Sequence, residues 1–490
     1  MTFENFFEIM TKKPVFFRIF ILCNKKTIKV LKFKVSDVII VVDKQISEKI
    51  FNNKRERFFM SMYEEKTART EWFRNDRFGM FIHWGIYSIP ARGEWVRSPE
   101  KMSVEEYQKY FDAFDPKYYD PKKWAKIAKN AGMKYAVMTA KHHDGFCLFD
   151  SKLTDYKATN TPAGRDLIKE YVEAFRAEGI KVGIYYSLID WHHDDYPHYG
   201  DAIHPMRENE EWKDYKHNFS NYIEYMHGQV RELMTNYGKI DIMWFDFSYD
   251  EMRDEKWEAT KLVKMIRSIN PDIIIDDRLS MAVSNGNMSF DYDTAPYYTG
   301  DFKSPEQVIP VNGLKDAKGR AIPWEACITL NNNWGYVPQK TGYKKSKDVI
   351  RMLVECVSKN GNMILNVGPN AKGEIPKESI KILEEIGEWM HENDESIYGC
   401  GQAVGFDKPE WGRYTMNGKK LYAHVFDRGI SSIMLDGLKG KVKSARLLSD
   451  YSEMQFSEPF FSKNNPTAIY LNIPEGLPDE KDTVVEFELN

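Results

Sequence analysis

The stretch GKIDIMWFDFS, residues 238–248, decides the fold. Its run from Ile240 to Phe245 has the length and apolar character of a strand buried in a parallel sheet. The strands of a parallel barrel present their functional side chains at their carboxyl ends. Asp246 stands at such an end between aromatic residues, which makes it a candidate for covalent chemistry. The alternative for a single Asp after a strand is the N-cap of a helix.

Similar strand-like runs recur along the chain and alternate with amphipathic helical segments. Strands are expected at 79–83, 135–140, 181–187, 240–246, 272–276, 326–330 and 362–367. Helices with apolar residues at three- and four-residue spacing are expected at 121–131, 165–178, 212–236, 255–269, 346–359 and 378–392. This alternation predicts an α/β fold of the (β/α)8-like (TIM) barrel type.

The two ends of the chain differ from this pattern. After about Tyr398 the residues alternate with a period of two, which predicts a C-terminal antiparallel β-sandwich. The first 59 residues contain no Gly, one Pro, and 13 Lys/Arg against 6 Asp/Glu. We therefore expect an atypical basic extension at 1–59, either non-native or poorly ordered, a catalytic barrel at 60–397 and the sandwich at 398–490. Translation from Met60 or Met62 would explain the extension.

Composition narrows the class of protein. The net charge is −4 and the body of the chain has no long basic run, so we expect no nucleic-acid partner. The apolar segment 14–23 is interrupted by Arg18 and is too short to cross a bilayer, so we expect neither a signal peptide nor a membrane anchor. Five scattered cysteines without a CxxC pair favour reduced thiols in a cytoplasmic protein.

Polar residues follow the expected strands at their carboxyl ends. They are His83, His142, His143, Tyr185, Tyr186, Asp246 and Arg278. Because such ends converge on one face of a barrel, the pattern predicts a polar ligand site among aromatic residues. Histidines and aspartates also bind metals. However, adjacent side chains such as His142 and His143 alternate in direction along a strand, which disfavours a shared ion.

Seven stretches of the chain together resemble glycoside hydrolase family 29, the α-L-fucosidases, from about Trp72 to Cys400. They are WFRNDRFGMFIHWGIYSIPARGEW (72–95), KYAVMTAKHHDGFCLFDSKLTDY (134–156), KVGIYYSLIDWHH (181–193), GKIDIMWFDF (238–247), DFKSPEQVIP (301–310), PWEACITLNNNWGY (323–336) and KNGNMILNVGP (359–369). The resemblance implies retaining hydrolysis of terminal α-linked L-fucose on a TIM-like barrel followed by a β-sandwich. It also implies that no metal and no organic cofactor take part.

The resemblance also implies roles for individual residues. The nucleophile falls on Asp246, and Arg278 beside it would lower the pKa of that carboxyl. The acid/base is expected at Glu306, with Glu325 as runner-up and Asp301 as a distant third. The fucose-binding groups look like His83, Glu94, Trp95, His142, His143, Tyr186, Trp244 and Arg278. For Glu306, the sequence Ser304–Pro305 before it leaves open a purely structural role at a helix start.

One position departs from the family pattern. Many family members have glycine directly after the nucleophile, whereas Phe247 stands here and Ser248, Tyr249 and Asp250 follow it. Linkage preference, and the choice between L-fucose and L-galactose, therefore stay open. The sequence leaves two other functions open: a related glycosidase with another sugar specificity, and a catalytically silent carbohydrate-binding protein. The sequence leaves open whether the chain forms a homo-oligomer.

Overall fold

The computed structural model describes residues 61–280, 291–339, 342–427, 433–458, 466–472 and 477–490, with two short strands nearer the amino terminus. The chain divides into two compact units, Met1–Met60 and Ser61–Asn490. In the first, β1 (Phe33–Val35) and β2 (Val38–Ile40) form an antiparallel pair. The rest of the expected extension at 1–59, with the Met60 start, lies outside the described residues. None of the helices described is long and apolar enough to span a membrane.

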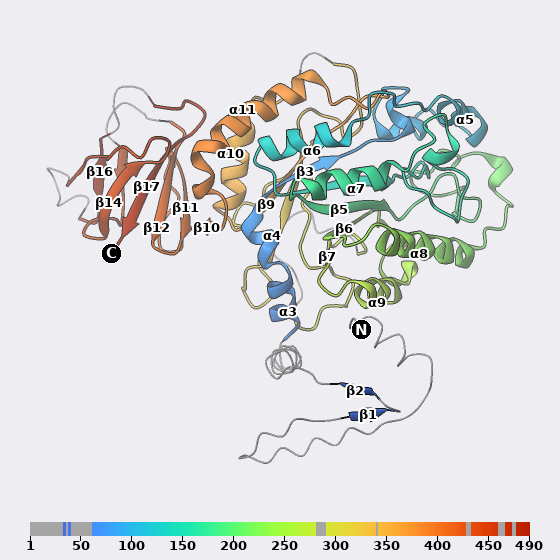
Figure 1. Ribbon diagram of the computed structural model, residues 1–490, viewed down its shortest axis with the longest axis horizontal. Coiled ribbons are helices and arrows are strands. Elements are labelled where there is room, and N and C mark those ends of the chain that lie inside the picture. Colours follow the sequence, from blue (N-terminus) through green and yellow to red (C-terminus); the bar gives the residue numbers. More distant parts are fainter. Residues whose placement is uncertain are drawn as a thin grey trace. The chain divides into compact units, whose positions relative to one another are not determined.

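Seven parallel strands form the central sheet of the second unit (Figure 1). They are β3 (Phe78–Ile82), β4 (Tyr135–Lys141), β5 (Lys181–Ser187), β6 (Ile242–Asp246), β7 (Ile274–Ile275), β8 (Glu325–Thr329) and β9 (Asn362–Val367). The order across the sheet is β7-β6-β5-β4-β3-β9-β8. Each strand expected from the sequence is present, which confirms the TIM-like barrel.

The segment 301–307 closes the sheet between its two end strands. The backbone N–H of Asp301 donates to the carbonyl of Ile275 in β7 at 2.7 Å. On the other side, the N–H of Glu325 in β8 donates to the carbonyl of Lys303 at 2.8 Å. These bonds, with isolated bridges farther along, put the segment in the place of an eighth strand. We refer to residues 301–307 as the closing segment.

Helices flank the sheet on its outer side (Figure 1). They are α3 (Met62–Arg69), α4 (Glu71–Asp76), α5 (Val104–Asp112), α6 (Pro121–Asn130), α7 (Leu167–Ala177), α8 (Phe219–Asn236), α9 (Ala259–Ile269), α10 (Ser346–Val357) and α11 (Lys377–Asn393). α6 begins where expected because Asp120 caps it, accepting from the N–H of Lys123, and Pro121 occupies the first turn. α8 and α9 begin later than expected, since short 3-10 turns precede them.

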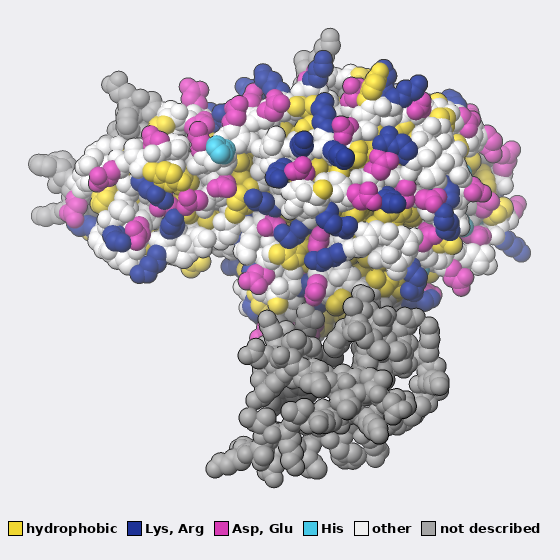
Figure 2. Space-filling view, in the orientation of Figure 1, with side chains coloured by type: hydrophobic (Ala, Val, Ile, Leu, Met, Phe, Trp, Pro, Cys, Tyr) yellow, Lys and Arg dark blue, Asp and Glu magenta, His cyan; other side chains and the backbone are white. Residues whose placement is uncertain are grey.

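Aromatic side chains fill the inside of the barrel. Phe81, Tyr185 and Trp244 belong to one buried cluster there, while the helices pack on a second, larger cluster outside the sheet. A barrel of this size is packed with side chains and has no pore. The floor of any site at the strand ends is therefore rigid and largely apolar. On the surface seen in Figure 2, basic and acidic side chains are interspersed.

The C-terminal region consists of two antiparallel sheets, which confirms the expected β-sandwich. One has the order β10-β11-β12-β17-β14 and the other β13-β16-β15. The strands are β10 (Gly401–Gln402), β11 (Gly412–Asn417), β12 (Lys420–Val425), β13 (Ile433–Leu435), β14 (Val442–Leu447), β15 (Phe456–Ser457), β16 (Ile469–Leu471) and β17 (Thr483–Leu489). The indole of Trp389 in α11 donates to the carbonyl of Asp482 at 2.9 Å, so this region packs directly on the barrel helices.

Candidate active site

A cavity of about 300 Å³ lies at the carboxyl ends of the barrel strands. Its lining consists of Phe81, His83, Glu94, Trp95, His142, Ile203, Trp244, Asp246, Phe247, Ser248, Tyr249, Arg278, Glu306, Cys327 and Trp334. The cavity thus combines aromatic walls with three carboxylates that the sequence singled out, Glu94, Asp246 and Glu306. Such a mixture suits a ligand that has apolar faces and many hydroxyl groups.

Asp246 ends β6 and is held by three donors. Its Oδ1 accepts from Arg278 Nη1 at 2.9 Å and from the N–H of Phe247 at 2.9 Å. Its Oδ2 accepts from the hydroxyl of Tyr185 at 2.9 Å. Burial raises the pKa of this carboxyl, and Arg278 acts in the opposite direction. The lowering that we expected from Arg278 is therefore present but outweighed by desolvation, and the three donors fix the orientation of the carboxylate.

Arg278 joins the two candidate catalytic carboxylates. Its Nη1 donates to Asp246 and, at 3.1 Å, to Oε2 of Glu306. Its Nε and Nη2 are anchored on the hydroxyl and the carbonyl of Ser304, each at 3.0 Å. The guanidinium also lies over the ring of Trp244, 4.8 Å from its centroid. The arginine is thus fixed at both ends, and it sets the spacing of the two acids.

Glu306 extends from the closing segment toward Asp246. The nearest oxygens of the two carboxylates can be no farther apart than the sum of their distances to Arg278 Nη1, about 6 Å. Retaining glycosidases separate their carboxyl groups by about 5–5.5 Å and inverting ones by about 6.5–9.5 Å. The arrangement therefore favours retention. Glu306 Oε1 accepts from the indole of Trp334 at 3.2 Å, and its side chain is 45% exposed against 17% for Asp246.

His83 and Glu94 lie on the wall of the cavity formed by the segment after β3. His83 Nδ1 contacts Asn366 Oδ1 at 2.7 Å, and since a carbonyl oxygen only accepts, Nδ1 carries the proton. Burial lowers the pKa of His83 to about 3, so its Nε2 is free to accept from a ligand hydroxyl. Glu94 accepts from the N–H of Gly335 at 2.7 Å, and burial raises its pKa. Trp95 is exposed at the rim.

His142 and His143 follow β4 and point in different directions, as the sequence predicts for adjacent residues. His142 Nε2 lies 3.2 Å from the Tyr185 hydroxyl, which already donates to Asp246, so Nε2 is the donor in this pair. His142 Nδ1 has no partner among the described residues. The ring of His143 stacks on Trp191 at 3.8 Å. Burial lowers the pKa of both histidines well below the ordinary value.

The comparison with known families agrees with this geometry. The family model for alpha-L-fucosidase matches residues 46–395, which include every residue of the cavity. The chain belongs to the α-L-fucosidase family. A curated relative, the alpha-L-fucosidase of Dictyostelium discoideum, is 27% identical over 443 residues, covering 84% of this chain and 89% of its own.

Solved α-L-fucosidase structures match in fold as well as in sequence. Isoenzyme 1 from Paenibacillus thiaminolyticus is 60% identical with a TM-score of 0.83, and the match covers 87% of this chain and all of that one. A GH29 enzyme from Bacteroides thetaiotaomicron is 32% identical with a TM-score of 0.73, covering 86% and 96% of the two chains. That structure holds a trapped covalent intermediate formed from 2-fluoro-fucosyl fluoride in a glutamate-to-glutamine mutant. A covalent intermediate is the mark of a retaining, double-displacement mechanism.

Tyr186, suggested for this fucosidase-family site, takes another position. Tyr186 points away from the cavity and donates to Gln229 of α8 at 2.7 Å. Its neighbour Tyr185 faces inward instead, because adjacent side chains in a strand lie on opposite faces. Trp244 lies where the sequence predicts, stacked on Tyr185 with 5.6 Å between ring centroids. The tyrosine of β5 that faces Asp246 is therefore Tyr185, and the expectation that Tyr186 faces the cavity is wrong.

The alternative acids are remote from the fucosidase cavity. Glu325 is the first residue of β8 and accepts from the hydroxyl of Tyr135, the first residue of β4, so it lies at the amino ends of the strands. Burial raises its pKa to about 8. Asp301 is buried between Arg69 and Arg267, and these cations lower its pKa although burial alone would raise it. Neither carboxylate lines the cavity, which leaves Glu306 facing Asp246.

The residue after the candidate nucleophile has an unusual backbone. Phe247 has φ +74°, in the left-handed region that favours glycine. Its ring lines the cavity and lies 5.6 Å from Trp95 and 5.1 Å from His143. Glycine, the residue expected here from the family resemblance, suits this conformation, whereas this chain places an aromatic ring there at a cost in strain.

Two residues at the site were given no role there by the sequence. Trp334 donates to Glu306, and Ser304 anchors Arg278. Trp334 and Ser304 lie within two of the stretches that carry the family resemblance, and that position was their only signal in the sequence. Among the described residues, no group of three or more His, Cys, Asp or Glu side chains is arranged to hold a metal ion.

Proposed function

We propose that the protein is a retaining exo-glycosidase that removes terminal α-L-fucose from fucosylated oligosaccharides or glycoconjugates. Asp246 is the nucleophile and Glu306 the acid/base. The observation that carries the proposal is the single nitrogen of Arg278 that hydrogen-bonds both carboxylates and keeps them within about 6 Å. A carbohydrate-binding protein without catalysis has no need of two acids paired in this way.

The reaction proceeds by two displacements. Asp246 attacks the anomeric carbon while protonated Glu306 gives its proton to the glycosidic oxygen, so the leaving sugar departs as an alcohol. The fucosyl ester of Asp246 is then attacked by water. Glu306, now a carboxylate, takes one proton from that water as the ester bond breaks, which returns both carboxyl groups to their starting states.

Neutral imidazoles and carboxylates would orient the sugar ring. His83 Nε2 and His142 Nδ1 are acceptors in the tautomers assigned above, and sugar hydroxyls donate to such atoms. Buried Glu94 offers a further acceptor at the same wall. The rings of Phe81 and Trp244 give the apolar surface that the 6-methyl group of fucose requires.

The test is hydrolysis of an aryl α-L-fucoside by the parent and by Asp246→Ala, with and without azide. The parent is expected to be active, and the variant is expected to lose activity by several orders of magnitude. Azide should then attack the substrate directly and give β-fucosyl azide. Faster hydrolysis of an L-galactoside than of the fucoside would favour the glycosidase of altered specificity. Tight fucose binding without turnover of any glycoside would favour the binding protein.

We further propose a cytoplasmic location, with no nucleic-acid or membrane partner. The four described cysteines are all buried and unpaired, which suits a reducing compartment. On the face shown in Figure 2, acidic and basic side chains are interspersed, which supports the absence of a nucleic-acid partner. Cell fractionation tests the location. Light scattering of the purified protein tests for a homo-oligomer, and sequencing of its native amino terminus tests the start at Met60.

A further inference from the structure

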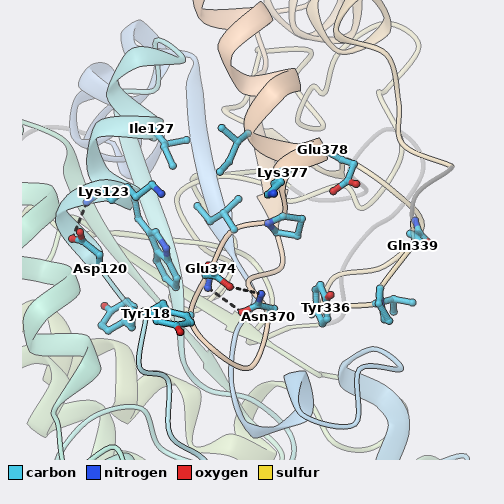
Figure 3. Close-up of a pocket in the computed structure, with 18 of the residues that line it drawn as sticks. Tyr118, Asp120, Lys123, Ile127, Tyr336, Gln339, Asn370, Glu374, Lys377 and Glu378 are labelled. Carbon is cyan, nitrogen blue, oxygen red and sulfur yellow. Dashed lines mark hydrogen bonds between the residues drawn. The ribbon is translucent and has the colours of Figure 1, made fainter.

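A second, larger cavity of about 790 Å³ lies outside the catalytic one (Figure 3). Its walls come from three connections that follow barrel strands: residues 117–120 between β3 and α6, residues 336–339 after β8, and residues 370–376 between β9 and α11. It therefore opens at the same end of the barrel as the catalytic cavity. We call it the outer groove.

The chemistry of the outer groove favours a neutral, polyhydroxylated ligand. Tyr118, 59% exposed, and Lys123 lie across the groove from Tyr336 and Gln339 (Figure 3). Charged groups of both signs line it in equal number: Lys117, Lys123 and Lys377 against Asp120, Glu374 and Glu378. Such a balance gives no net attraction for an anion or a cation. Aromatic faces combined with scattered donors and acceptors suit sugar rings.

Several polar side chains of the groove are available to a ligand. Asp120 caps α6, and Glu374 accepts from Asn370 at 3.2 Å, so these are already used within the protein. The side chains of Lys123, Gln339, Lys377 and Glu378 have no hydrogen-bond or ion-pair partner among the described residues. The groove itself is firmly built. The N–H of Tyr118 donates to the carbonyl of Lys372 at 2.9 Å, which ties two of its walls together.

One short segment connects the groove to the catalytic cavity. Trp334 lines the catalytic cavity and donates to Glu306, whereas Tyr336 lines the outer groove. Two residues of chain span at most about 7 Å, so Trp334 and Tyr336 lie close together. Glu306 as the acid protonates the glycosidic oxygen, so the leaving group lies on the side of the cavity where Glu306 meets Trp334. A sugar chain that continues past Trp334 would therefore come to Tyr336 and the groove.

We propose that the outer groove binds the leaving-group sugars of a fucosylated oligosaccharide. This inference rests on the proposed fucosidase function and adds a binding site to it. Removal of an aromatic platform should weaken binding of a substrate that carries these sugars and leave a substrate without them unaffected. The relevant variant is Tyr118→Ala, because Tyr118 is exposed and does not line the catalytic cavity.

The experiment measures hydrolysis of fucosyllactose and of an aryl α-L-fucoside by the parent, Tyr118→Ala, Lys123→Ala and the control Tyr297→Ala. Tyr297 is another exposed tyrosine and lines neither cavity. For Tyr118→Ala and Lys123→Ala we expect KM for fucosyllactose to rise about five- to tenfold, with aryl fucoside hydrolysis unchanged within about twofold. Equal effects on both substrates, or none, would overturn the proposal.

A titration with lactose separates failure of this inference from failure of the fucosidase assignment. Lactose stands for the leaving group after fucose is removed, and its binding is followed by saturation-transfer NMR without any turnover. Binding that Tyr118→Ala abolishes and Tyr297→Ala preserves supports the groove even if the parent hydrolyses neither fucoside. Absence of binding to the parent, or binding that is insensitive to Tyr118, rules the groove out.

Discussion

Arg278 Nη1 lies 2.9 Å from Asp246 Oδ1, and this hydrogen bond is made by the same nitrogen that contacts Glu306. Arg278→Lys keeps the positive charge. It loses the planar set of donors with which the guanidinium binds Ser304 and both carboxylates. We expect kcat/KM for an aryl α-L-fucoside to fall about 100- to 1000-fold with little change in the melting temperature. Arg165→Lys, at a pair with Glu170 far from the cavity, serves as control. A loss of less than tenfold would contradict the role of the shared nitrogen.

The two candidate acids can be told apart by matched substitutions. Glu306→Ala should lower activity by at least 100-fold, and azide should restore it with formation of α-fucosyl azide, since azide then attacks the fucosyl ester. Glu325→Gln should keep nearly full activity, because Glu325 lies at the other end of the barrel. The products are identified by NMR. An inactive but folded Glu325→Gln, or β-fucosyl azide from Glu306→Ala, would refute the assignment.

Glu325 also predicts a stability effect that depends on pH. Its folded pKa of about 8 exceeds the ordinary value of about 4.5, so the unfolded chain releases a proton that the folded chain holds. The stabilisation contributed by protonated Glu325 is therefore fully present below about pH 4.5, and it is lost as the pH rises toward 8. Glu325→Gln should remove that decline, so its melting temperature should exceed the parent's more at pH 8 than at pH 5. A constant difference across this range would contradict the shift.

Buried histidines predict a loss of stability in acid. His83 has a folded pKa of about 3 because of burial, so between about pH 6.5 and 3 the unfolded chain binds a proton that the folded chain does not. One such histidine removes about 2 kcal/mol of unfolding free energy by about pH 5. His83→Gln should lessen the fall in melting temperature between pH 7 and 5, and exposed His391→Gln serves as control. Equal falls in parent and His83→Gln would refute this.

The strained backbone at Phe247 predicts that the usual stability order of alanine and glycine variants is reversed at this position. Both Phe247→Ala and Phe247→Gly lose the ring, but only glycine adopts φ +74° without strain. We expect the glycine variant to be more stable by about 1 kcal/mol in urea unfolding. At Phe111, inside α5, the usual order should hold, with alanine the more stable. Finding alanine more stable at both positions would show that position 247 carries no strain.

The sequence predicted the barrel strands because each is a short buried run, and burial on both faces leaves a continuous apolar signal. It did not predict the closing segment. Residues 301–307 make only isolated bridges and are rich in charged and polar side chains, so no strand pattern exists there.

The choice of Tyr186 over Tyr185 failed for a different reason. An apolar run buried on both faces does not show which of two adjacent tyrosines points inward.

The catalytic carboxylates of the site could be predicted from the sequence, whereas the residues that hold them in place were harder to predict. Asp246 and Arg278 stand at strand ends, where position alone indicates function. The strand expected at 326–330 already put Glu325 at an amino end, so its place as runner-up rested on the family resemblance and not on its position in the barrel. The sequence also could not show whether burial or the charge of Arg278 has the larger effect on the pKa of Asp246, because this depends on how the cavity is packed.

The closing segment carries Glu306 and also completes the barrel, so the same few hydrogen bonds close the sheet and hold the proton donor in place. Any loosening of this segment from β7 or β8 opens the barrel wall and withdraws the proton donor together, while Asp246 stays at the end of β6.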